Sequence, residues 1–428
     1  MAAISLTDVS GLLKTAFVGP INSAISKKVW LLKQLQWTNK WRIKGSKTVQ
    51  HPIQLVRSTS VGFRNASSDG LPPVTHQETV QATTTLKILY AYTEFYGDTL
   101  RVTAEEPGAF ASAFKTEIGS LIQSIRIETN RALYMAGTGV LGQVASLGNG
   151  SGTNDRITVR TSASQSVPPN MRWFEKGMHI DIINPATGSS RITGTYSEGV
   201  KISVRNKTSY TIDVVDPSTG NSVDLSGVNV TAGDYIVVFG NYNKEPYGLD
   251  AICDDGTNVS SFLNISETTY DRWKAYVQDV SWGQLTETHL QNLLDEIEDY
   301  DGQILLVCDK KVRNKIARLV KSTMVQPQTL DLKGGFKAIS YGDYTIYADR
   351  YAPYGQLFGI NLNHIIPHQL NASKDNIFKA FDFADIDGKV LHPTRNADIY
   401  YAKGSVYYNF TTNQRNAFGK ISNIDPTA

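Results

Sequence analysis

One stripe of apolar residues between positions 103 and 136 constrains the fold of this chain more than any other feature. Its members recur at intervals of three and four, which places them on one face of an α-helix; they are Phe110, Phe114, Ile118, Leu121, Ile122, Ile125, Thr129, Ala132 and Leu133. Pro107 suits the first turn, and Gly137 and Gly139 favour an end just beyond the stripe. A helix of about 28 residues is roughly 40 Å long. The pattern therefore predicts a structural spine.

Two strand-like runs precede this helix. They extend from Thr48 to Ser58 and from Val80 to Phe95, and about twenty mostly polar residues with several Gly and Pro separate them. Residues 46–96 are therefore predicted to form one long hairpin with an extended tip. An isolated two-stranded hairpin is marginal in water and exposes two edges, so it needs a partner in its own chain or in a neighbouring one.

Residues 1–45 have the character of an arm and not of a domain. The segment that holds Trp30, Leu32 and Trp37 carries much apolar surface in a short length. We expect this surface to be buried on something outside the segment.

The pattern changes after the helix. Residues 146–246 begin with the linker-like composition of Gly148–Gly152 and continue as short β-rich runs separated by turns, which predicts a small inserted all-β barrel or sandwich. From 247 to 428 the pattern is mixed: a helix from Thr286 to Tyr300, a buried strand Ile304–Cys308, a second helix starting near Asp309, and several later strands. The fold class predicted for the chain is α+β.

Composition and charge narrow the function. The formal net charge is only +2, with 19% charged residues, and no basic stripe of the kind that grips nucleic acid is visible. The N-terminus lacks a signal peptide pattern, and no apolar run approaches the roughly 20 residues that span a bilayer. Cys253 and Cys308 are expected to be free thiols, although a disulfide stays open as an alternative.

Three motifs match binding patterns in letters only. Gly137–Gly142 has the spacing of a dinucleotide loop, but it follows a helix instead of a strand. His364 and His368 have zinc-protease spacing, but the catalytic Glu is missing and Pro367 would break the helix. Gly45–Thr48 resembles the end of a phosphate loop but precedes a strand. We therefore expect no cofactor and no metal site.

The sequence also lacks a catalytic constellation. It contains no Cys-x-x-Cys, no Gly-x-Ser-x-Gly and no clear cluster of His, Cys and carboxylates. Acidic residues of the helix near position 295, among them Asp295 and Glu296, are interpreted as a solvated face. We predict that the protein is not an enzyme.

Short segments along most of the chain carry a family resemblance. They are Gly70-Leu71-Pro72, Tyr247–Ile252, Tyr270–Trp273, and Leu330–Phe336 followed by Tyr341-Gly342-Asp343, Ala348-Asp349 and Tyr351-Ala352-Pro353. Together with the order of the predicted parts, they resemble the major capsid proteins of tailed bacteriophages, which share the Hong Kong 97-type fold with encapsulins.

The resemblance implies a division of the chain into five parts. These are an N-terminal arm (1–45), an E-loop β-hairpin (46–96), a P-domain with the spine helix (97–145), the inserted β-rich domain (146–246), and an A-domain with the remaining P-domain strands (247–428).

The resemblance also implies a function. The chain is expected to self-assemble into the icosahedral shell that encloses the double-stranded DNA genome of a tailed phage, without sequence-specific binding of that DNA. Its partners would be copies of itself in hexamers and pentamers, with scaffolding, portal and decoration proteins as further candidates. Its location would be the virion, after assembly in the host bacterial cytoplasm. The residues expected to contact neighbouring subunits are Trp30, Leu32, Trp37, Phe63, Leu71 and Val74.

Two alternatives stay open at this point. The first is the shell of an encapsulin-like compartment, which would bury a cargo peptide instead of a genome. The second is a β-rich carbohydrate-active enzyme, which would need two carboxylates about 5–10 Å apart.

Overall fold

The computed structural model describes most of the chain. The described residues are 30–38, 40–43, 45–65, 70–98, 107–161, 169–298, 302–323, 329–332, 336–341, 344–370, 392–394 and 397–425. Most of the expected arm, residues 1–29, lies outside them. Among the described helices, none is long and apolar enough to cross a membrane.

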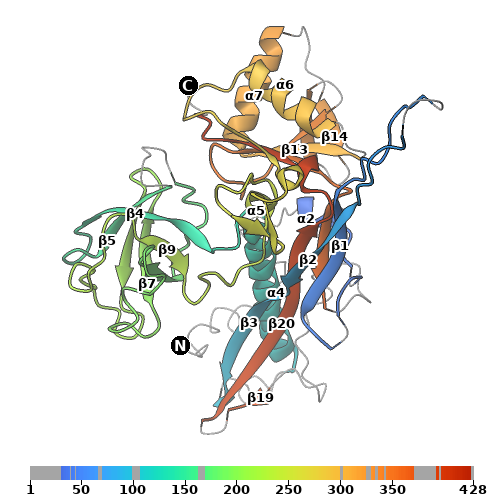
Figure 1. Ribbon diagram of the computed structural model, residues 1–428. Coiled ribbons are helices and arrows are strands. Elements are labelled where there is room, and N and C mark those ends of the chain that lie inside the picture. The colour runs from blue at the N-terminus through green and yellow to red at the C-terminus, as the bar shows by residue number, and fades with distance from the viewer. Residues whose placement is uncertain are drawn as a thin grey trace.

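The spine helix is present as α4 (Pro107–Ala132), and it begins at the predicted proline. Ile125 and Leu133 of the predicted stripe are buried, and Thr129 has no exposed surface. Beside the helix lies a long ribbon in which β3 (Lys87–Tyr96) pairs antiparallel with β20 (Ile399–Thr412) (Figure 1). Two shorter strands also pair with β20: β18 (Ile365–Gln369) and β19 (His392–Pro393).

Gly248 closes the C-terminal end of the spine. The N–H of Gly248 donates to the carbonyl of Met135 (2.9 Å), and the N–H of Leu249 donates to that of Leu133 (2.6 Å). These bonds satisfy carbonyls that a helix end leaves without partners. A Cβ at position 248 would stand 2.4 Å from the Leu133 oxygen, so only glycine fits this approach. The segment then continues as the short helix α5 (Leu249–Ile252).

The predicted hairpin is formed by β1 (Thr48–Val56) and β2 (Glu78–Thr85), which pair antiparallel. The second predicted run, however, is two strands and not one. It breaks at Leu86, whose side chain is 3% exposed and whose N–H donates to the Lys47 carbonyl (2.9 Å), and it continues as β3 in the other sheet. The break was not predicted because both halves have the same strand-like composition.

Six strands form a closed barrel between α4 and α5. In sequence order they are β4 (Val140–Gly148), β5 (Arg156–Arg160), β6 (His179–Ile183), β7 (Val200–Asn206), β8 (Thr211–Val215) and β9 (Tyr235–Val238). Val144, Ile157, Ile202 and Ile236 are fully buried in its core. The predicted β-rich unit is thus a barrel and not a sandwich, and it starts at Val140 instead of at residue 146.

The segment Gly148–Gly152 is not a linker, which corrects the expectation from its composition. It joins β4 to β5, two adjacent strands of the barrel. The Asp155 carboxylate accepts hydrogen bonds from the N–H groups of Gly150 (2.6 Å) and Gly152 (2.7 Å). These bonds hold the turn and, despite an opposing contribution from burial, lower the pKa of Asp155. A Cβ at Gly150 would stand 2.8 Å from Asp213 Cγ, and one at Gly152 would stand 2.2 Å from Ser222 Oγ, so both positions favour glycine.

The last part of the chain builds a seven-stranded sheet. Its order is β12 (Tyr276–Asp279), β21 (Gly419–Ser422), β17 (Leu357–Asn361), β13 (Ile304–Cys308), β16 (Tyr344–Ala348), β15 (Phe336–Tyr341) and β14 (Thr329–Leu332). The predicted strand 304–308 is confirmed, and every residue in it is buried because both faces of the sheet are covered. Leu306 and Cys308 face the helices α6 (Glu287–Glu298) and α7 (Lys310–Thr323), whereas Leu305 and Val307 belong to the main core.

Short elements complete the described chain. They are α2 (Trp30–Gln34), β10 (Ser261–Phe262), β11 (Ile265–Ser266), and the 3₁₀ turns η1 (Asp271–Trp273) and η2 (Arg415–Ala417). Cys253 and Cys308 are both free and buried, which confirms the expectation that they are not paired with each other.

Candidate assembly surface

The connection between β1 and β2 extends away from the body of the molecule (Figure 1). Near its base its two sides are held together by hydroxyl groups. The Thr59 N–H donates to Thr75 Oγ1 (2.7 Å), and the Ser58 hydroxyl donates to the Thr75 carbonyl (2.8 Å). These bonds extend the hairpin beyond its last strand pair, so the tip is built by its own polar groups and not by packing on the body.

Four large apolar side chains of this tip face solvent. Their exposed fractions are 89% for Val61, 107% for Phe63, 94% for Leu71 and 77% for Val74. Val61 and Phe63 are two residues apart, which places them on the same side of an extended segment. Apolar groups gathered at one exposed place mark an interaction surface more often than chance exposure.

The base of the hairpin is anchored in its own chain. The Asn409 side chain of β20 donates to Thr84 Oγ1 (3.0 Å) and to the Thr85 carbonyl (2.9 Å), and the Thr83 N–H donates to the Leu263 carbonyl (2.8 Å). The sequence left open whether the hairpin's partner lies in its own chain or in a neighbouring one; its own chain holds the root, and only the tip projects.

The three residues proposed from the arm behave differently from the tip. Trp30 is 6% exposed, with its ring 4.5 Å from that of Tyr347, and Leu32 is 1% exposed. Trp37 is half-buried, and its ring packs on Tyr408 and Phe410 of the same chain. The chain's own core covers Trp30 and Leu32, and their contact with a neighbouring subunit stays a prediction.

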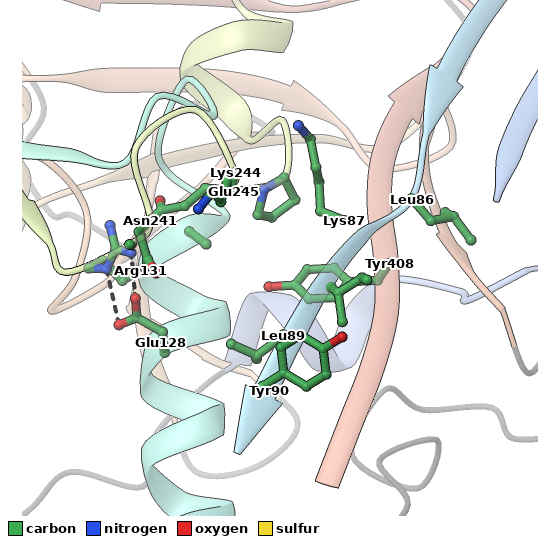
Figure 2. A pocket seen from close by; sticks show the side chains of 14 residues that line it. Leu86, Lys87, Leu89, Tyr90, Glu128, Arg131, Asn241, Lys244, Glu245 and Tyr408 are labelled. Carbon is green, nitrogen blue, oxygen red and sulfur yellow. Dashed lines mark hydrogen bonds and ion pairs between the residues drawn. The ribbon is translucent and has the colours of Figure 1, made fainter. Parts of the chain in front are cut away.

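A cavity of about 530 Å³ lies between α4, β3 and the loop that leaves the barrel. Figure 2 shows Glu128 and Arg131 on α4 across the cavity from Leu89 and Tyr90 of β3. Arg131 is 2% exposed; its Nε donates to Glu128 (3.1 Å) and its Nη2 donates to Glu245. Burial would lower the pKa of this guanidinium, but the charges of Glu128 and Glu245 outweigh burial and raise it.

This arrangement argues against the glycosidase alternative. Both carboxylates are engaged in ion pairs with the same buried guanidinium, that of Arg131. A glycosidase needs one carboxyl group that holds a proton for the leaving group. Lys87 on the same wall donates to the Asn243 carbonyl (3.2 Å), and burial lowers its pKa. Glu128, Arg131 and Glu245 thus serve one another as structural partners, and Lys87 serves the backbone.

The motifs that matched binding patterns have structural roles. Gly137 (φ 89°) and Gly139 (φ 76°) form the turn from the spine into β4, and a strand follows them, not a helix. His364 bonds Asn413, whereas His368 is buried and bonds Thr411. Within the described ranges, no group of three or more His, Cys, Asp or Glu is placed to hold a metal ion.

Comparisons with known proteins establish the fold. No family model matches the sequence, and no curated protein matches it significantly. The solved structure of the cyanophage A-1(L) capsid asymmetric unit matches with a TM-score of 0.57 at 11% identity, over 99% of this chain and 100% of that chain.

Two further structures match over nearly the whole chain. They are the holo-SrpI encapsulin complex from Synechococcus elongatus PCC 7942 (TM-score 0.48, 10% identity, covering 100% of this chain and 98% of that one) and Mycobacterium phage Bobi (0.44, 10%, 98% and 99%). Of these three matches, the one to the cyanophage structure supports the fold assignment: this chain has the Hong Kong 97-type fold of phage capsid proteins.

Proposed function

We propose that this protein is the major capsid protein of a tailed phage, which self-assembles into an icosahedral shell around double-stranded DNA. The full-length likeness to a phage capsid subunit supplies the fold. The observation that carries the functional step is the projecting tip, whose four apolar side chains stand in water in the isolated chain.

The parts of the chain take the roles that the fold offers. The β1–β2 hairpin is the E-loop, and α4 with the β3–β20 ribbon is the P-domain. The seven-stranded sheet with α6 and α7 is the A-domain, and the six-stranded barrel is the inserted domain. With the barrel starting at Val140, the boundary between the P-domain and the insertion moves upstream of the sequence estimate.

Assembly needs no catalysis in this proposal. Phe63, Leu71 and Val74 of one copy are buried on the next, and each such side chain contributes about 1.5–3 kcal/mol when removed from water. Because every subunit repeats the contact, modest energies sum around a closed shell. The net charge of +2 avoids trapping the enclosed DNA against the wall. Scaffolding, portal and decoration proteins remain further candidate partners.

The test is the assembly state of the purified full chain. Light scattering across protein and salt concentrations, with electron microscopy of the same samples, is expected to show capsomers, shells or tubes. A monomer under every condition would overturn the proposal. Mass spectrometry of the particles tests the compartment alternative, because particles that hold a second, stoichiometric cargo protein would favour it over a phage head.

A further inference from the structure

Two helices of opposite charge cover one face of the seven-stranded sheet. α6 packs on β12, β17 and β21, whereas α7 packs on β16. Their apolar residues share one cluster, with Leu293 and Ile297 from α6 and Val312 and Ile316 from α7. α6 carries four acidic residues and no Lys or Arg, and α7 carries six Lys and Arg and no acidic residue.

The charges of both helices point outward. On α6, Asp295 and Glu296 are exposed; we call this pair the acidic end. On α7, Lys310, Lys311 and Arg318 are exposed, and Lys311 and Arg318 are seven residues apart and so lie on one side; we call these three the basic face. No ion pair joins the acidic end to the basic face within the described part of the chain.

The acidic end of α6 and the lysines Lys310 and Lys311 of α7 each carry a charge opposite in sign to the one that the dipole of their own helix favours at that end. Asp295 and Glu296 lie at the C-terminal end of α6, where the helix dipole favours cations, and the last turn holds no basic residue. Lys310 and Lys311 lie at the N-terminal end of α7, where the dipole favours anions, and its first turn holds no acidic residue. Both helices therefore carry charges that weaken them locally.

The capping carboxylate of Asp309 offsets part of the positive charge at the N-terminal end of α7. Asp309, just before the helix, accepts a hydrogen bond from the backbone N–H of Lys311 (3.1 Å) and pairs with Arg172 (3.0 Å). The Lys311 ammonium itself contacts the Tyr354 hydroxyl (3.2 Å). Solubility alone does not require charges that oppose the dipole at the C-terminal end of α6 and at the N-terminal end of α7.

We propose that the basic face of α7 in one copy pairs with the acidic end of α6 in the next copy around a capsomer ring. This inference rests on the proposed shell function. In a head-to-tail ring each interface joins two different patches of the same chain, so one chain must present both halves of the contact. Complementary charge then sets the register and rejects wrong pairings.

A second copy fits these observations better than an anionic polymer does. Nucleic acid would use the basic face of α7 but would be repelled by Asp295 and Glu296 on the adjacent helix of the same layer. Only a partner that offers both signs accounts for both helices, and the chain itself is such a partner.

Charge exchange tests the pairing. One variant is K310E/K311E, a second is D295K/E296K, and a third combines all four changes. Each one-sided variant is expected to lower the yield of closed particles at least about tenfold, because like charges meet at every interface. The combined variant restores the opposite pairing and is expected to recover particles. K201E/K207E, on exposed lysines of the barrel, is the matched control and should assemble normally.

The melting temperature separates assembly from folding. Both one-sided changes place charges of the favourable sign at their helix ends, so the melting temperature of the unassembled subunit should not fall. Wild-type assembly with unimpaired one-sided variants would overturn this inference and leave the shell function standing, whereas failure of the wild type to assemble concerns the function itself. If K310E/K311E assembled normally but lost nuclease-protected nucleic acid, the basic face would be a polymer contact instead.

Discussion

The imidazole rings of His51 and His368 lie 6.5 Å apart in the interior, where the hairpin meets the body. His51 belongs to β1 and His368 to β18, and they are 4% and 1% exposed. His51 Nε2 lies 3.4 Å from the Thr412 carbonyl, and His368 Nε2 lies 2.9 Å from Thr411 Oγ1. Around these rings the described structure offers hydroxyl, carbonyl and aromatic groups but no paired carboxylate.

This pair predicts an acid-sensitive attachment of the hairpin. Burial, and then the neighbouring His51, lower the pKa of His368 to about 4, and burial lowers that of His51. An unfolded histidine titrates near 6.5, so between about 6.5 and about 4 the unfolded chain binds more protons than the folded one. Stability therefore falls as the pH falls through that window, by up to roughly 3 kcal/mol for His368 alone.

Denaturant unfolding of the subunit between pH 7.5 and 4.5 checks this loss. H368Q should flatten the pH dependence, whereas H76Q, at an exposed position in the tip, should leave it unchanged. Hydrogen exchange should show β1 and β2 losing protection first. An identical pH dependence in wild type and H368Q would contradict the assignment.

The tip predicts a separation of assembly from stability. The triple variant F63S/L71S/V74S removes apolar groups that are already in water, so the melting temperature should change by no more than about 1 °C. Particle formation, followed by electron microscopy, should be strongly reduced. V204S removes a half-exposed valine on the barrel (54% exposed) and should affect neither quantity. Normal shells from the triple variant would contradict the role of the tip.

The buried ion pairs of Arg131 predict a large loss of stability. Substitution R131M leaves the buried carboxylate of Glu245 without its cation, which costs about 3–5 kcal/mol. Adding E245Q should recover part of this loss, since the remaining partner Glu128 is 28% exposed at its side chain. K274M, which breaks the exposed pair with Asp271, should change the free energy of unfolding far less than R131M does. Urea unfolding of the four proteins gives the comparison.

The barrel predicts different behaviour for two fragments. Residues 138–241 contain all six strands and should give dispersed amide signals and a cooperative melt. Residues 150–246 lack β4, which pairs with both β5 and β9, so the barrel cannot close and should not fold. A folded 150–246 fragment would show that β4 is dispensable and would return the boundary to the position estimated from sequence.

Local patterns of the sequence determined the regular elements. The three- and four-residue spacing of Ile125, Thr129 and Leu133 predicts α4, and the apolar run 304–308 predicts β13, because periodicity reports which face of an element is buried. The pattern of short strands predicts a β-rich unit in the same way. The order of elements also favours a structural role for Gly137–Gly142, because this segment follows a helix and leads into a strand.

Long-range partners were decided only by the tertiary structure. Trp30 is buried on Tyr347 of its own chain, whereas Phe63 is fully exposed. Composition does not distinguish the two, because both are aromatic residues outside any clear periodic pattern. The break at Leu86, the turn around Asp155 and the meeting of His51 with His368 likewise depend on residues far away or on backbone geometry. Sequence periodicity predicts that one face of an element is buried, but only the tertiary structure decides which residues pack on that face.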